Sequence, residues 1–278
     1  MRQTNLINIV QKRRTKMNDL QKMAQEKSVL QWGGLAGILG SITLIVVFGI
    51  VGVFVGLEPV EPAREVMRFP DVRTALIVGD SLYLVVLILW VIHFLALYRA
   101  LRETSLAPAL FGSVLGILGL VVLAADSLHG PWQKPISDLY HAPGATLEAQ
   151  ATLVLLWRVT EGIFNALFVT GLVLLPIGVI ALGVAMFKAP AFGKGFGGLS
   201  VVLGVVGVVA ASVLLVDPPS PVAILGVFAL IVFHLVLGWK VYSLSRAPWG
   251  VLKIGERAGA LKTMQEGRVD APAPFEGT

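Results

Sequence analysis

The stretch GGLAGILGSITLIVVFGIVGVFVGL, residues 33–57, contains no charged side chain and is long enough to cross a bilayer as one helix. Five further apolar segments of similar length follow, at about 74–98, 107–125, 164–187, 196–216 and 222–242. Of the 278 residues in the chain, 56% are hydrophobic and only 14% are charged, whereas soluble domains are about a quarter charged. The sequence therefore predicts an all-α, polytopic membrane bundle of six transmembrane helices.

Lysine and arginine are unevenly distributed between the segments that connect the apolar runs. Most of the 22 basic residues lie in the N-terminal arm, in the C-terminal tail and in the connections near Arg99 and Lys188. Basic residues favour the cytoplasmic side of a membrane, so we expect both termini in the cytoplasm. The chain then divides into a cytoplasmic basic amphipathic arm over residues 1–31, a six-helix transmembrane domain over 32–245 and a cytoplasmic tail over 246–278.

Small residues recur at a spacing of four in several of the apolar segments. In lipid, helices associate through close packing, which small side chains permit. We interpret these pairs as packing faces within the chain, and the alternative is that a face on the first helix docks another protein. The pairs are Gly33/Gly37, Gly52/Gly56, Gly112/Gly116, Ser200/Gly204 and Gly207/Ala211.

Charged and polar residues gather at the outer end of the predicted bundle. The helix that contains the fourth apolar run has no break between about Thr146 and Phe187, which makes it about twice as long as a bilayer core is thick. Its polar residues would therefore lie at headgroup level, where Asp80 is the expected partner of Arg158. We predict a salt-bridged polar outer cap, with a ligand or ion vestibule and a metal site as alternatives. The cap residues are Asp80, Asp126, Arg158, Glu161 and Asn165.

The connection over residues 127–145 should fold over the outer mouth of the bundle. It contributes to two Asp-x-x-His pairs, Asp126 with His129 and Asp138 with His141. On a helix this spacing places both side chains on one face, where two such pairs would chelate a divalent ion. These four residues are the only metal ligands that the sequence suggests.

Two further histidines, His93 and His234, are isolated polar residues in apolar helices at matching depth near the cytoplasmic side. The default interpretation is a packing histidine that is hydrogen-bonded to a backbone carbonyl. The alternatives are a proton relay and axial ligation of one haem. No cofactor is predicted as a first choice.

The N-terminal arm is predicted to be helical over residues 4–30. Its basic cluster, Lys12, Arg13, Arg14 and Lys16, indicates an interfacial helix on anionic lipids of the inner leaflet. A helix that binds a protein partner is the alternative. Because membrane topology accounts for the basic residues, nucleic acid is not an expected partner.

Two short motifs resemble those of an uncharacterised bacterial family of six-helix integral membrane proteins, catalogued as a domain of unknown function. They are ALYRALR at Ala96–Arg102 and RVTE at Arg158–Glu161. The resemblance covers about residues 33–245 and implies a multi-pass protein of the plasma (inner) membrane. It implies no catalytic residues.

Enzymatic activity is the function class with the least support. The chain has no cysteine, which excludes thiolate chemistry, and it contains neither a glycine-rich phosphate loop nor a zinc-protease motif. We therefore predict a non-catalytic accessory or structural subunit of a larger membrane complex, contacted through the first helix and the arm. The alternatives are a small-solute or proton-linked transporter or channel, and a haem-binding redox protein that uses His93 and His234.

Overall fold

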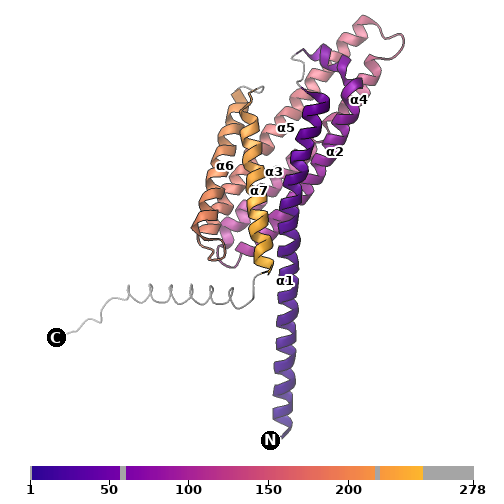
Figure 1. The fold of residues 1–278 in the computed structure, drawn as a ribbon. Helices are drawn as coiled ribbons and strands as arrows, with labels where there is room; N and C mark the ends of the chain where they lie inside the picture. The colour runs from indigo at the N-terminus through magenta and orange to yellow at the C-terminus, as the bar shows by residue number, and fades with distance from the viewer. Residues whose placement is uncertain (1, 57–60, 217–219, 247–278) are drawn as a thin grey trace, which may run out of the picture.

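The computed structural model describes residues 2–56, 61–216 and 220–246, without the side chains of residues 2–20, 22 and 223. Every regular element in these ranges is a helix, so the predicted all-α class is confirmed (Figure 1). The elements are α1 (Arg2–Ile50), the π-helical turn η1 (Val51–Val55), α2 (Pro62–Leu101), α3 (Leu106–Asp126), α4 (His129–Tyr140), α5 (Leu147–Phe187), α6 (Gly193–Val216) and α7 (Val222–Arg246).

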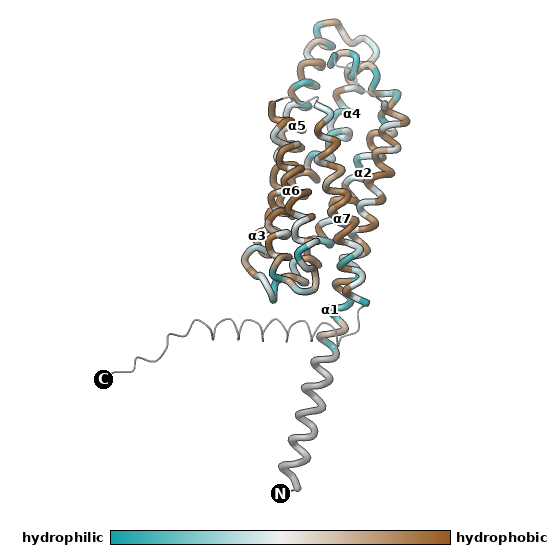
Figure 2. The backbone as a smooth tube through the Cα atoms, turned by 60° about the vertical axis from the view of Figure 1, so that its left-hand side comes forward, coloured by the Kyte–Doolittle hydropathy of each residue, from teal (hydrophilic) through white to brown (hydrophobic). Residues whose placement is uncertain are grey.

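Six helices in the described part of the chain are long and apolar enough to cross a membrane, as predicted. The protein is therefore a multi-pass integral membrane protein. Hydrophobic residues predominate along the length of the bundle, and hydrophilic residues gather at its two ends, one of which carries α4 (Figure 2). The long α5 begins where the sequence places it, because the Thr146 hydroxyl accepts a hydrogen bond from the Ala149 amide at 3.2 Å and caps the helix.

The spanning helices form a closed ring. In the order α1, α2, α3, α5, α6, α7, each helix packs against the next, and α7 packs against α1. The short helix α4 packs on α2 and α5 at one end of the ring, which we call the α4 end. The N-terminal part of α1 extends well beyond the opposite end, where α7 finishes (Figure 1).

Glycines bring the backbones of neighbouring helices into direct contact. A methyl group added at Gly178 of α5 would lie 2.5 Å from the Gly116 amide nitrogen and 2.6 Å from the Gly112 carbonyl oxygen of α3. Gly204 and Gly207 of α6 pack in the same way on Pro176 of α5. The small-residue pairs on α3 and α6 are therefore packing faces within the chain, as interpreted from the sequence.

The two halves of the glycine face on α1 have different surroundings. Gly33 packs on Ala96 of α2, and Gly37 packs on His93 and on the backbone of His234 in α7. This half is filled by the chain itself and is closed to a foreign helix. The second half continues into η1, where a methyl group at Gly52 would meet nothing within 4 Å.

The connection expected to fold over the outer mouth forms the helix α4, although it contains Pro135. Its Ile136 joins Val66 and Phe69 of α2 and Trp157 of α5 in a second, small hydrophobic core. This core is built from the parts of α2 and α5 that extend beyond the main core of the ring. The predicted start of the second span, at about residue 74, was too late, since α2 begins at Pro62.

The arm predicted to be helical over residues 4–30 is part of α1, which continues without a break into the first span. An arm lying flat on the membrane would need a bend between the two parts, and α1 has none. Glu26 at the base of the arm forms an ion pair with Arg99 of α2. The side chains of the basic cluster and the tail from residue 247 lie outside the described residues.

Candidate functional site

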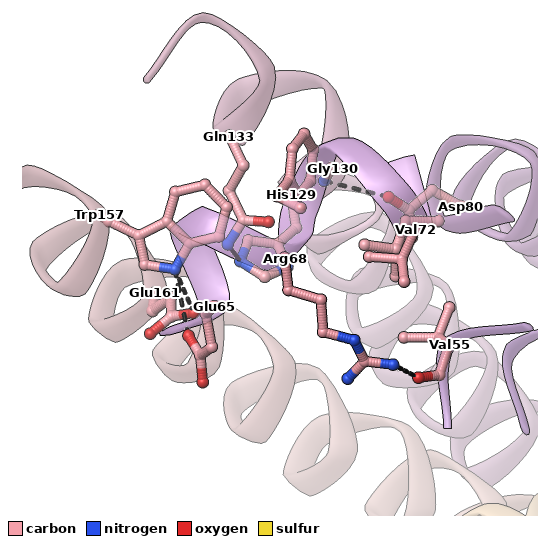
Figure 3. A pocket seen from close by; sticks show the side chains of 12 residues that line it. Val55, Glu65, Arg68, Val72, Asp80, His129, Gly130, Gln133, Trp157 and Glu161 are labelled. Atoms are coloured by element: carbon pink, nitrogen blue, oxygen red, sulfur yellow. Dashed lines mark hydrogen bonds between the residues drawn. The ribbon is translucent and has the colours of Figure 1, made fainter. Parts of the chain in front are cut away.

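A compact polar cluster occupies the α4 end of the bundle (Figure 3). The Trp157 indole Nε1 donates hydrogen bonds to Glu161 Oε1 at 2.8 Å and to Glu65 Oε2 at 3.1 Å. The Arg68 guanidinium donates to the carbonyl oxygen of Val55, where η1 ends. These residues line a small cavity of about 60 Å³. The cluster therefore ties α2, α5 and η1 together.

Asp80 connects the polar cluster to α4. Its Oδ2 accepts a hydrogen bond from the Gly130 amide at 3.0 Å, and a methyl group at Gly130 would lie 2.5 Å from the same oxygen. Gly130 thus allows the backbone of α4 to approach the carboxylate. The Gln133 amide nitrogen, on the next turn of α4, donates to His129 Nε2 at 2.6 Å.

Asp126, at the end of α3, lies near enough to Asp80 for the two carboxyl groups to interact electrostatically, and Tyr83 interacts with both. Both aspartates are partly buried. Within the described ranges, no lysine, arginine or histidine forms an ion pair with either of them. Two carboxyl groups without a basic partner, on spanning helices, indicate a functional site.

A larger cavity of about 570 Å³ begins at Asp80 and extends along the ring between α1, α2, α5 and α7. Its wall is almost entirely apolar, and Asp80 and Tyr83 are the polar exceptions near its α4 end. The lining residues are Leu44, Ile45, Val47, Phe48, Val51, Gly79, Asp80, Tyr83, Trp90, Leu123, Phe168, Leu172, Ile224, Val227, Phe228, Leu230 and Ile231.

Trp90 forms the far end of this cavity and packs against the buried His234, which in turn contacts His93. The Trp90 ring stacks on His234, with centroids 3.9 Å apart and an angle of 9° between the planes. The His93 ring lies edge-on to His234 at 5.2 Å. His93 Nδ1 donates to the Gly33 carbonyl oxygen at 2.9 Å, which leaves Nε2 as an acceptor. His93 thus matches the default interpretation of a histidine bonded to a backbone carbonyl.

Unpaired polar atoms concentrate around these three rings. Among the described side chains, five buried nitrogen or oxygen atoms have no hydrogen-bond partner, and four of them belong to Trp90, His93 and His234. A haem would have to lie between the two imidazoles, which are in direct contact. The residues therefore do not fit a bis-histidine haem as they are arranged.

Two of the predicted cap residues lie elsewhere. Arg158 is exposed on α5 and forms no ion pair with Asp80 or Glu161 among the described residues. Asn165 is also exposed and lines a separate groove between α5 and α6. The salt bridge predicted for Arg158 is therefore wrong, because the inward face of α5 carries Trp157 instead. Asp80, Asp126 and Glu161 do lie at the α4 end.

The four metal-ligand candidates do not converge. Asp138 accepts from Lys134 at 2.6 Å and from Arg73 at 3.3 Å, and His141 Nδ1 donates to the Ser137 carbonyl oxygen at 2.8 Å. No group of three or more His, Asp or Glu residues in the described ranges is arranged to hold a metal ion. His129 lines the small cavity and Asp138 pairs with basic side chains, so the structure does not bring the four residues of the alternative metal site together.

Several residues of the polar cluster were not identified from the sequence. Glu65 and Arg68 are one turn apart on α2, and a start of this helix at Pro62 would have placed them together. Trp157 and Gln133 carry no motif, and only the packing of α4 on α5 brings them to the cluster.

Comparison with known proteins gives no match, whether with family models, curated proteins or solved structures. The resemblance to the six-helix family of unknown function therefore stays a prediction.

Proposed function

We propose that the protein binds a small amphipathic molecule inside the membrane, in the 570 Å³ cavity between α1, α2, α5 and α7. The cavity itself supports this proposal, because sites for small molecules are concave, mostly apolar and supplied with a few convergent polar groups. Asp80 and Tyr83 are the polar groups near one end, and the remaining wall suits a hydrocarbon or aromatic body. This function belongs to the transporter class rather than to the enzymes.

The rim of the cavity favours entry from the lipid. Phe48 of α1 and Ile224 and Phe228 of α7 line the cavity, and each is at least half exposed. These side chains face the hydrocarbon region on one side and the cavity on the other. A ligand that partitions into the bilayer would therefore reach the site between α1 and α7 without crossing water. We place the protein in the plasma (inner) membrane, as the family resemblance implies, and the charge distribution predicts both termini in the cytoplasm.

The test uses a neutral fluorescent amphiphile, N-phenyl-1-naphthylamine, and the full chain purified in detergent. Val227→Trp fills the cavity from α7 and should weaken saturable binding at least tenfold. Val202→Trp, on an exposed position of α6 outside the cavity, adds the same side chain and should leave binding unchanged. No saturable binding to the wild-type protein, or equal binding by the two variants, would refute the proposal.

An accessory or structural subunit of a membrane complex is the second candidate. The open face of α1 and η1 favours it, since Gly49 and Gly52 have nothing within 4 Å of an added methyl group, and such faces let helices approach closely. Gly49→Leu should then reduce co-purification of a partner, and so should removal of residues 2–22. A set of co-purifying proteins that neither change alters would exclude this role for α1.

A further inference from the structure

We infer that the ligand of the large cavity is a hydrophobic cation, whose positive group lies beside Asp80, with the charge of Asp126 acting on it from outside the cavity wall. This inference rests on the proposed function and specifies the class of molecule that the cavity accepts. It starts from the two carboxyl groups, which meet no basic partner in the described part of the chain.

An unpaired carboxylate within a spanning segment loses much of its hydration and gains little in return. The Gly130 amide compensates one oxygen of Asp80 through its hydrogen bond of 3.0 Å. No hydrogen bond to Asp126 occurs among the described residues, and its neighbour Asp80 adds a repulsive charge. A cation in the cavity beside Asp80 supplies the missing counter-charge.

The neighbouring polar cluster is also negatively charged, like Asp80 and Asp126. Three carboxyl groups line the small cavity, those of Glu65, Asp80 and Glu161, together with one guanidinium, that of Arg68. His129 is the other titratable group there. Low-dielectric walls strengthen the field of such a cluster. The α4 end of the large cavity therefore attracts cations and repels anions, including the phosphates of ordinary lipids.

Aromatic rings line the remainder of the site. A cation is attracted to the faces of aromatic rings, most strongly where water is excluded. Rings on α1, α2, α5 and α7 surround the space, so a bulky apolar cation has aromatic contacts on several sides. The aromatic lining residues are Phe48, Tyr83, Trp90, Phe168 and Phe228.

Trp90 closes the end of the cavity that lies away from Asp80. The residue is 1% exposed, and a methyl group added at Gly40 of α1 would lie 2.8 Å from its Nε1, so the indole N–H faces α1. The carboxyl group of Asp80 and the aromatic rings therefore describe a site whose end at Asp80 selects positive charge.

The experiment compares two probes of similar shape, the tetraphenylphosphonium cation and neutral triphenylphosphine oxide, by equilibrium dialysis against the purified full chain. The wild-type protein should bind the cation at least tenfold more tightly than the neutral probe. Asp80→Asn and Asp126→Asn keep the size of the side chain and should each remove most of this preference. Asp138→Asn, a carboxylate paired with Lys134 outside the cavity, is the matched control and should not change it.

Binding of N-phenyl-1-naphthylamine by the same variants shows whether the cavity is intact. It also distinguishes a failure of the cation inference from a failure of the proposed function. If a variant still binds this neutral amphiphile, a loss of cation binding reflects charge and not unfolding. Equal affinity of the wild-type protein for both phosphorus probes, or a cation preference that survives both Asn variants, would overturn the inference while the proposed function stands. If the wild-type protein binds none of the three molecules, the proposed function fails with it.

Discussion

Replacing Gly178 with alanine tests the close packing on which the ring depends. The added methyl group would lie 2.5 Å from the Gly116 amide nitrogen and 2.6 Å from the Gly112 carbonyl oxygen. Carbon atoms in ordinary contact are about 3.5–4.0 Å apart, so α3 and α5 must separate by roughly 1 Å. Both obstructing atoms belong to the backbone, so no side-chain rotation relieves the clash.

The expected loss follows from this geometry. Overpacking costs about 1–3 kcal/mol, and a clash with rigid backbone places Gly178→Ala in the upper half of this range. Alanine also favours a helix over glycine by about 0.5–1 kcal/mol, which offsets part of the loss. We therefore expect Gly178→Ala to lower the free energy of unfolding by about 1–2 kcal/mol, on the order of a tenfold change in the unfolding equilibrium.

Gly162→Ala is the matched control, since it adds the same methyl group to the same helix where nothing lies within 4 Å. It should be neutral or stabilising by up to about 1 kcal/mol. Reversible unfolding in mixed micelles with a rising fraction of sodium dodecyl sulfate, followed by circular dichroism, measures both variants. If the two free energies agree within about 0.5 kcal/mol, the backbone contact between α3 and α5 does not limit stability and the reasoning is refuted.

Three further predictions concern topology and polar contacts. Reporters fused after Arg102 and after Lys134 should lie on opposite sides of the membrane, the first in the cytoplasm, and reporters on the same side would contradict the helix count. Trp157→Phe keeps the apolar ring but removes the donor to two carboxylates, so chemical unfolding should show a loss of about 1–3 kcal/mol, and an unchanged midpoint would show that water replaces the donor. Arg99→Gln removes the ion pairs with Glu26 and Glu103 and should cost no more than about 1 kcal/mol, with the loss disappearing at high salt; a loss that persists there would indicate packing instead.

The sequence alone was sufficient for the parts of the fold that hydrophobicity controls. Long apolar runs with few or no charges predicted six spans, and the unbroken pattern from Thr146 predicted the full length of α5. The extension of α2 from Pro62 was missed because its first turns are amphipathic and contain Arg64, Arg68 and Pro70. The mean hydropathy of such a segment is lowered by its charged residues and does not reveal the apolar face that packs against α4.

The candidate site was harder to predict because it depends on the rotation of helices. Arg158 and Trp157 are neighbours in sequence, so a difference of about 100° around α5 decides which of them faces the bundle. Packing of α4 on α5 decides in favour of Trp157, and no local pattern carries that information. The large cavity has no sequence signature at all, since its volume is set by the relative positions of four helices.

The closure of the ring by α1 and α7 has a consequence for how the protein is made. Each of the other spanning helices packs against one that leaves the ribosome just before or after it, whereas the contact between α1 and α7 joins segments about two hundred residues apart. Contacts of this kind form late, because a long stretch of chain must be ordered first. Both helices line the large cavity, so the cavity is completed only when the last helix is inserted. A chain truncated before α7 would insert five spans and have an incomplete cavity. In a circular permutant, a linker would join the end of α7 to the beginning of α1, and the contact between these two helices would then form first.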